Sequence, residues 1–292
     1  MRQISTEGLE IAGQGISGDV YRYGSDKVIK VFHDTFTEEQ VERAFTVGKF
    51  VYDNGIPTAE PYEVIRSGNC YGMIAEYVGY PTLLSQIAEG SVSRQDGALG
   101  MGPILRKVHD LKPIPGIQTE HEMVAGILDR CRSILKDDEI SELMEHIDRF
   151  PGKDYVIHGD FHEKNILVRG DKDFLLIDLD SVCVGSPLFE MLQMFCIYKT
   201  GIPKKLRVTP EEGCLFLRTI LEIYFDTKDD ELLSTYEEIF TDVSWFSVMF
   251  SKILRMQKGE EEQIRKEIQQ DLPLLMEAFG RAESKYGLLP WR

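Results

Sequence analysis

The spacing of apolar and polar residues divides the chain into a strand-rich beginning and a longer helical remainder. Residues 9–32 alternate between the two kinds and carry β-branched side chains between glycine-containing turns, which predicts two or three strands. Apolar residues next recur at helical spacing, and Thr37 with Gln40 three residues later has the pattern of a capping box. Two more strands are predicted at residues 61–66 and 71–78, joined by a hairpin turn.

Helical periodicity dominates the rest of the chain, apart from one short β-rich stretch. Helices are predicted near residues 94–111, 120–149, 187–200, 210–226, 229–241, 243–257 and 260–285. Strands are predicted at residues 155–157, 165–168 and 174–177, with a turn at 169–172. The pattern therefore predicts an α+β fold of two lobes. We expect a small antiparallel β-sheet with one helix over residues 1–78 and a mainly helical lobe over residues 79–292.

Composition limits the partners and the compartment. The chain has 292 residues, 42% of them apolar, which is enough for a buried core in two lobes. Its formal net charge of −16 repels nucleic-acid phosphates and anionic lipid, so we expect neither partner. The five cysteines form no Cys-x-x-Cys pair, which favours reduced thiols over disulfides or zinc. No signal-peptide or membrane-length apolar run is visible, so a cytoplasmic protein is expected.

The short β-rich stretch carries the pattern most specific to one chemistry. Asp160 is followed by Asn165 five residues later and, after a short hairpin, by Asp178. In phosphoryl transfer, an aspartate accepts the proton of the attacking hydroxyl and hard oxygen ligands hold Mg²⁺. We therefore expect Asp160 to accept the proton, and Asn165 and Asp178 to bind the metal. Turn capping would explain each residue alone, but it does not explain all three at this spacing.

The same stretch resembles a known family. The segments HGDFHEKNILV (158–168) and LLIDLDSVCVGSPLFEM (175–191) resemble the aminoglycoside phosphotransferase and choline kinase-like superfamily. The segment LRKVHDLKPIPG (105–116) resembles the leucine-histidine helix end of that superfamily, and the resemblance covers nearly the whole chain. It implies a protein-kinase-like fold and transfer of the γ-phosphate of Mg-ATP, or of GTP, to a hydroxyl of a small molecule.

Further nucleotide-binding positions can be sought beside the resemblance. A G-x-G-x-x-G pattern is formed by Gly13, Gly15 and Gly18. Glycines there would let backbone amides approach phosphates closely, although this pattern alone is weak evidence for a nucleotide site. Lys30 is flanked by apolar residues in a strand, so it could face solvent at an edge, but the resemblance assigns it to the α- and β-phosphates. The resemblance also assigns adenine to the carbonyl of Ala75 and the amide of Tyr77.

One expected partner of the strand lysine is missing. Kinases of this kind pair that lysine with a glutamate on the N-lobe helix, and Ala44 stands at that position here. Glu42 lies two residues away, about 200° around the helix, so it faces elsewhere. The helix could be rotated, Lys30 could be held by Asp178 or the nucleotide, or catalysis could be weakened. The last option defines the alternative function, a nucleotide-binding pseudokinase or regulatory protein.

The chain after the metal aspartate favours a small acceptor. Pro187 follows Asp178 by nine residues, which leaves no room for the activation segment of a protein kinase. The acceptor candidates are aminoglycosides, choline or ethanolamine, amino-sugars, fructosamines and homoserine-like or thio-sugar metabolites. A set of acidic residues could face a cationic acceptor or form a solvated surface, namely Glu211, Glu212, Asp226, Asp229 and Asp230. Nothing in the sequence sets the oligomeric state.

Several residues near the motif are expected to support it. His158 should hold the loop by packing and hydrogen bonding, and His109 should close a helix. Ser186 should cap the helix that starts at Pro187. Glu190 stands where the family often has an aspartate, and it keeps a carboxylate on a longer arm.

Overall fold

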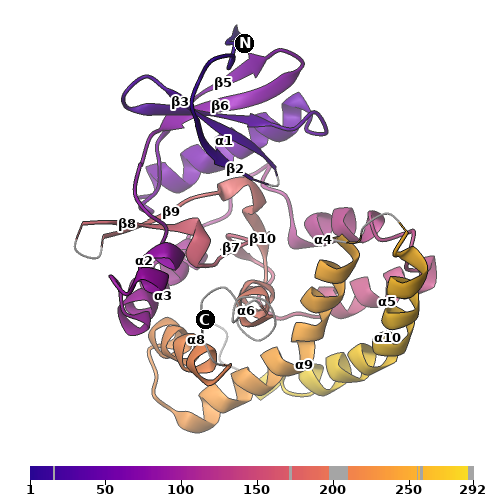
Figure 1. Ribbon diagram of the computed structural model, residues 1–292. Helices are drawn as coiled ribbons and strands as arrows, with labels where there is room; N and C mark the ends of the chain where they lie inside the picture. The colour runs from indigo at the N-terminus through magenta and orange to yellow at the C-terminus, as the bar shows by residue number, and fades with distance from the viewer. Residues whose placement is uncertain (16, 171–172, 197–209, 255, 257–258, 289–292) are drawn as a thin grey trace. The chain divides into compact units, whose positions relative to one another are not determined.

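The computed structural model describes residues 1–15, 17–170, 173–196, 210–254, 256 and 259–288 (Figure 1). The contacts within the chain divide it into two compact units. The sheet unit consists of Met1–Gln86, Pro115–Ile117 and Glu163–Asp180. The helical unit consists of Ile87–Ile114, Gln118–His162 and Ser181–Arg292. The division of the chain into lobes at residue 78 stays a prediction.

The sheet unit is built on a six-stranded sheet with the order β1-β5-β6-β4-β3-β2 (Figure 1). Its strands are β1 (Arg2–Gln3), β2 (Ile11–Gln14), β3 (Gly18–Tyr23), β4 (Lys27–Phe32), β5 (Pro61–Ser67) and β6 (Cys70–Glu76). Neighbouring strands pair antiparallel, except that β1 runs parallel to β5. The predicted antiparallel sheet is present, and the short parallel β1 is an addition that two residues are too few to signal in a pattern.

Helix α1 (Glu38–Asp53) contacts β5 and β6 of this sheet. The predicted capping box is present, because the Thr37 side chain accepts from the Gln40 amide while the Gln40 side chain accepts from the Thr37 amide. On its inner face, Ala44 packs in an apolar cluster with Phe32. Position 44 therefore belongs to the core of the sheet unit.

A hairpin from the middle of the chain also belongs to the sheet unit. Strands β8 (Ile166–Arg169) and β9 (Asp173–Leu176) pair antiparallel, as predicted. The Leu176 amide donates to the Pro57 carbonyl at 2.7 Å, and the Val168 amide donates to the Pro81 carbonyl at 2.9 Å. These two hydrogen bonds join the hairpin to segments of the sheet unit that lie just outside its six-stranded sheet.

The helical unit combines long helices with a two-stranded ribbon. Its main helices are α3 (Arg94–His109), α4 (Glu120–Asp129), α5 (Asp137–Asp148), α6 (Pro187–Cys196), α8 (Pro210–Phe225), α9 (Asp230–Leu254) and α10 (Glu261–Glu283). The ribbon pairs β7 (Tyr155–Ile157) with β10 (Cys183–Gly185) antiparallel. Short elements elsewhere are α2 (Leu83–Glu89), η1 (Glu163–Asn165), η2 (Leu179–Ser181) and η4 (Tyr286–Leu288). None of the helices in the described part of the chain is long and apolar enough to cross a membrane.

The predicted helix breaks are wrong at two places. The single helix predicted at 120–149 is two helices, because α5 begins afresh where the Glu139 side chain accepts from the Lys136 amide at 2.8 Å. The break predicted at residue 242 does not exist, because α9 is continuous and its Asp242 pairs with Arg281 at 2.8 Å. The elements α2, β1 and β10 were not predicted. The predicted helical positions 197–200, 255 and 257 and the turn positions 171–172 lie outside the described residues.

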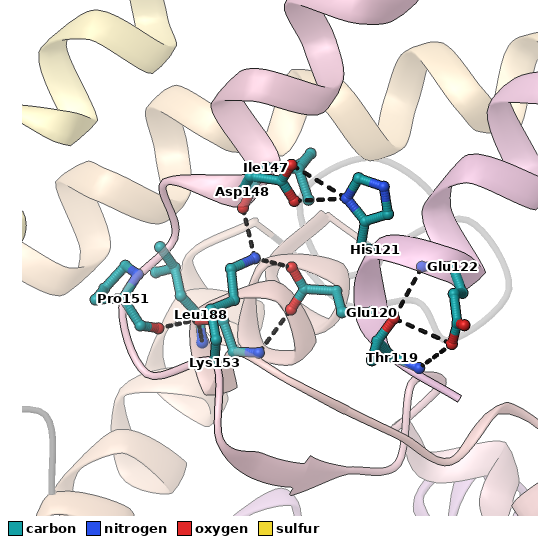
Figure 2. A network of polar contacts seen from close by, with 10 residues as sticks. Thr119, Glu120, His121, Glu122, Ile147, Asp148, Pro151, Lys153 and Leu188 are labelled. Carbon is teal, nitrogen blue, oxygen red and sulfur yellow. Dashed lines mark hydrogen bonds and ion pairs between the residues drawn. The ribbon is translucent and has the colours of Figure 1, made fainter. Parts of the chain in front are cut away.

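Buried polar contacts fix the start of α6 (Figure 2). Glu120, at the start of α4, is 1% exposed, and its carboxylate accepts from the Ser186 amide at 2.6 Å and from Lys153 Nζ. The Ser186 hydroxyl accepts from the Leu188 amide at 3.2 Å, so the predicted cap is confirmed. A Cβ at Gly185 would come within 2.5 Å of Glu120 Cβ, so this approach requires glycine.

We expect Lys153→Met to lower the free energy of unfolding by about 3–5 kcal/mol near pH 7, because it leaves the buried Glu120 carboxylate unpaired. Burial raises the pKa of Glu120, against the effect of Lys153, and loss of that lysine would raise the pKa further. A carboxyl whose pKa is higher in the folded state adds stability below its ordinary range and loses it as pH rises through the folded pKa. The cost of the substitution should therefore be smaller near pH 5 than near pH 7, as urea unfolding would measure.

The matched control is Glu120→Gln. Its single amide oxygen can replace Oε2 as the acceptor of the Ser186 amide, while Lys153, whose side chain is 33% exposed, keeps the Ile147 carbonyl as an acceptor. The buried residue at position 120 then carries no charge. Its cost should be smaller than that of Lys153→Met and should not grow over the same pH interval. Equal costs for Lys153→Met at both pH values would show that the Glu120 charge does not set the penalty.

Candidate active site

In the sheet unit, Lys30 on β4 contacts two carboxylates that follow β9. Its Nζ lies 2.7 Å from Asp178 Oδ1 and also donates to Asp180 Oδ2. The Ser17 hydroxyl donates to the same Asp180 oxygen at 2.9 Å. Strand β4 lies between β6 and β3, so Lys30 is not an edge lysine, and the solvent-facing interpretation is wrong.

The charges of this cluster do not cancel, because two carboxylates share one ammonium. Burial lowers the pKa of Lys30, but Asp180 and Asp178 outweigh it, so the pKa is raised and the lysine stays charged. Burial raises the pKa of Asp180, and Asp178 adds to this against the opposing effect of Lys30. The remaining negative charge would be relieved by a further cation.

The predicted metal-binding residues flank the β8–β9 hairpin. Asn165 is largely buried, and its backbone carbonyl accepts a hydrogen bond from the Ile177 amide at 2.9 Å. This bond ties Asn165 to the residue before Asp178. Asp178 has a φ of 62°, a left-handed conformation that non-glycine residues rarely adopt and that often marks functional sites.

These residue types fit Mg²⁺. The metal prefers oxygen ligands, and it usually takes one or two carboxylates while phosphates and waters complete its shell. Within the described residues, no group of three or more His, Cys, Asp or Glu side chains is arranged to hold a metal.

In the helical unit, Asp160 lies on the loop after β7. Its amide donates to Nδ1 of the buried His158 at 3.2 Å, in line with the holding role expected of that histidine. His162 Nε2 lies 3.4 Å from Asp160 Oδ1. Gly159 has a φ of 79°, and a Cβ there would come within 2.3 Å of the Ser181 carbonyl oxygen. Glycine is therefore required immediately before the aspartate.

The side chain of Glu190, in the first turn of α6, accepts hydrogen bonds from the backbone of this loop. Its carboxylate is fully buried, with Oε1 accepting from the Gly159 amide at 2.7 Å and Oε2 from the His158 amide at 2.9 Å. Bonds from an ionised acceptor to backbone amides are stronger than neutral ones. The longer arm noted in the sequence thus reaches the two residues that precede Asp160.

Packing explains only part of the glycine pattern in the first hairpin. A Cβ at Gly18 would come within 2.2 Å of the Val31 carbonyl oxygen, so the strand pairing itself requires this glycine. At Gly15 the closest atom would be 3.3 Å away, which is tight. At Gly13 the closest atom would be 4.0 Å away, so the protein leaves room for a side chain there.

The backbone assigned to adenine is already engaged. Ala75 lies in β6, paired with Val28 of β4. The Tyr77 amide donates to the Asp26 carbonyl at 2.8 Å, and the Arg22 guanidinium lies 3.3 Å from the centroid of the Tyr77 ring. The assignment of Ala75 and Tyr77 to adenine stays a prediction, and it would require the Tyr77 amide to exchange acceptors.

Structural contacts account for several of the acidic residues proposed to face a cationic acceptor. Glu212 pairs with Arg94 at 2.9 Å, and Asp230 pairs with Arg218. The Asp229 carboxylate accepts from the amide of Glu231 at 3.0 Å at the start of α9. These contacts favour the surface and capping interpretation for the three residues.

Two residues of this geometry were missed by sequence reasoning, namely Asp180 as a partner of Lys30 and Glu190 as the acceptor of the loop amides. Asp180 lies two residues after Asp178, and this repeated aspartate was the available signal. For Glu190 the only signal was its place in the family pattern. Both contacts join residues far apart in the chain, which local spacing cannot show.

Comparison with solved structures identifies the fold. The chain matches "aminoglycoside phosphotransferase APH(2'')-Ib, ADP-bound" with a TM-score of 0.62 and 18% identity, covering 94% of each chain. It matches the streptomycin-ATP-APH(2'')-IIa ternary complex with a TM-score of 0.61 and 18% identity, covering 91% of this chain and 93% of that one. It matches Plasmodium vivax ethanolamine kinase with a TM-score of 0.58 and 14% identity, covering 94% and 81%.

At these identities the likeness shows a shared fold, and it confirms the predicted α+β architecture. No curated protein sequence matches the chain at a significant level. The profile of the phosphotransferase enzyme family (APH), however, matches residues 8–230, which include the glycine hairpin, Lys30 and the Asp160–Asp178 segment. The chain therefore belongs to the phosphotransferase enzyme family.

Proposed function

We propose that the protein is a small-molecule kinase that transfers the γ-phosphate of ATP, or of GTP, to a hydroxyl group. The observation that carries the proposal is the cluster of Lys30, Asp178 and Asp180, in which a partly buried lysine pairs with two carboxylates. Family membership and neighbours crystallised with ADP, ATP or GDP support a nucleotide as the donor. The cysteines form no disulfide in the described residues, which suits a reducing compartment, so we place the protein in the cytoplasm.

Each residue takes one role in the proposed reaction. Asp160 accepts the proton of the attacking hydroxyl, and Lys30 supplies positive charge to the α- and β-phosphates. Asn165 and Asp178 hold Mg²⁺, which neutralises charge on the phosphates when bound. Glycines in the first hairpin let the backbone approach the phosphates. The protein contributes mainly positioning and charge, as phosphoryl transfer requires.

We propose a small acceptor because the chain between Asp178 and Pro187 is too short for a peptide-binding activation segment. The neighbouring structures include complexes with streptomycin and gentamicin and an ethanolamine kinase. An aminoglycoside-, choline- or amino-sugar-like acceptor is therefore the class to test first. A positive charge on the acceptor would match the acidic chain.

The second candidate is a nucleotide-binding pseudokinase, and Ala44 is the observation that favours it. Position 44 packs against Phe32 in an apolar cluster and carries no charge for Lys30. The two carboxylates on Lys30 weaken this argument, because the lysine is held without the helix glutamate.

The function is tested by incubating the protein with Mg-ATP and a panel of acceptors while ADP release is followed. The panel contains aminoglycosides, choline, ethanolamine, amino-sugars, fructosamines and homoserine, and Asp160→Asn serves as the blank. The proposal predicts acceptor-dependent ADP release by the wild type alone, with a phosphorylated product in the mass spectrum. Nucleotide binding without turnover of any acceptor would favour the pseudokinase.

Asp160→Asn and Asp178→Asn should separate the two acidic roles. Asp160→Asn should lower turnover by about 10²-fold or more while leaving the affinity for Mg-ATP within a few-fold, because only the proton acceptor is lost. Asp178→Asn should instead weaken nucleotide binding in the presence of Mg²⁺. Turnover assays and calorimetric titration would measure both, and a wild-type rate for Asp160→Asn would refute its role.

Gly13→Ala should impair nucleotide binding, whereas Gly18→Ala should impair the stability of the fold. Gly13→Ala should leave the free energy of unfolding unchanged within about 0.5 kcal/mol but weaken nucleotide binding, because its space is open in the protein and is needed by phosphates. Gly18→Ala should destabilise the fold, since its Cβ meets the Val31 carbonyl. Thermal unfolding with and without nucleotide distinguishes them, and unchanged nucleotide affinity in Gly13→Ala would remove that glycine from the binding site.

A further inference from the structure

A buried chain of hydrogen bonds in the helical unit ends at the amides beside Asp160. Its last members are the Glu190 carboxylate and the amides of His158 and Gly159, described above. Its earlier members are His109, at the end of α3, and Tyr224, in the last turn of α8. The residues His109 and Tyr224 are 3% and 2% exposed, so water does not replace these bonds readily.

The donor and the acceptor of each hydrogen bond in this series follow from the carboxylate of Glu190 and the hydroxyl of Tyr224 on either side of His109. His109 Nε2 lies 2.8 Å from Glu190 Oε2, and because a carboxylate only accepts, Nε2–H is the donor. His109 Nδ1 lies 2.8 Å from the Tyr224 hydroxyl oxygen. Burial raises the pKa of Tyr224, which keeps its hydroxyl protonated and able to donate to Nδ1. Every nitrogen of the imidazole thus has a defined partner.

Local packing places Tyr224 against His109. Helix α3 contacts α8, and a Cβ at Gly102 of α3 would come within 2.8 Å of Ile223 Cγ2, so glycine permits the close approach. The His109 and Tyr224 rings meet edge to face with centroids 5.3 Å apart. The ring of Tyr155, on the strand that leads to the Asp160 loop, lies 6.4 Å from the His109 ring in the same manner.

We propose that His109 and Tyr224 are positioning residues for phosphoryl transfer, acting through Glu190 on the loop that carries Asp160. The inference rests on the proposed function for its effect on turnover. Three donors orient the Glu190 carboxylate, and two of them are the loop amides themselves. Removing the His109 donor leaves the carboxylate held only by the two loop amides that it should position, so the alignment of the His158 and Gly159 amides is less firmly fixed. A small displacement of a catalytic group is costly to the rate.

The two nitrogens of His109 can be tested separately. In His109→Gln the side-chain amide reaches the position of Nε2 and keeps a donor for Glu190, whereas in His109→Asn it reaches only that of Nδ1. Tyr224→Phe removes the hydroxyl and nothing else. The matched control is His146→Leu, which removes both ring nitrogens and so breaks a second, mostly buried histidine–glutamate contact in the same unit, His146 Nδ1 to Glu283 Oε1 at 2.6 Å.

The first readout is hydrogen exchange of the His158 and Gly159 amides in the full chain without ligand. His109→Asn should speed their exchange about tenfold or more relative to amides of α10, and His109→Gln should restore most of the protection. The second is turnover of Mg-ATP with the panel acceptor that releases ADP fastest. His109→Asn should lower kcat about 10- to 100-fold with the KM for Mg-ATP unchanged, and Tyr224→Phe should lower it less.

The outcomes separate this inference from the proposed function. Faster exchange in His109→Asn but not in His146→Leu supports the positioning role even if no acceptor is turned over, in which case only the proposed function fails. Wild-type exchange and wild-type kcat in His109→Asn would overturn the inference. Equal losses in His109→Asn and His146→Leu, or no rescue by His109→Gln, would show that His109 is only a structural residue and would overturn the inference as well.

Discussion

The pairing of Lys30 with Asp178 and Asp180 is the interaction on which the account of the sheet unit depends. It joins a strand lysine to residues 148 and 150 positions later in the chain. It also gives the lysine counter-charges without a glutamate on α1, where Ala44 packs in the core. Because two carboxylates share one ammonium, these three side chains keep a negative charge that Mg²⁺ could balance.

Buried carboxylates play the corresponding part in the helical unit. Glu120 accepts from the Ser186 amide just before α6, and Glu190 accepts from two amides of the Asp160 loop. A buried carboxylate stabilises its surroundings only when its oxygens have donors, and here backbone amides supply them. Helix α6 therefore connects a structural anchor at its start to the loop that carries the proposed proton acceptor.

Local patterns were sufficient to predict most elements and the spacing of the proposed site. Strand alternation, the capping box at Thr37 and the Asp160–Asn165–Asp178 spacing are each visible within one short stretch of the sequence. The second carboxylate on Lys30 and the acceptor of the loop amides are contacts between distant segments, so no local pattern contains them. The false break in α9 has the same origin, because Asp242 is stabilised by Arg281 of α10. Polarity at that position reflected a partner on another helix rather than a helix end.

The most direct test of the charge argument is the affinity of the wild-type protein for ADP with and without Mg²⁺, measured by calorimetric titration. A cluster of net negative charge should repel free ADP more strongly than its magnesium complex, which carries less negative charge and brings a metal for the carboxylates, so Mg²⁺ should tighten binding by about tenfold or more. Equal affinities with and without the metal would contradict the account of Lys30, Asp178 and Asp180 as a metal–nucleotide site.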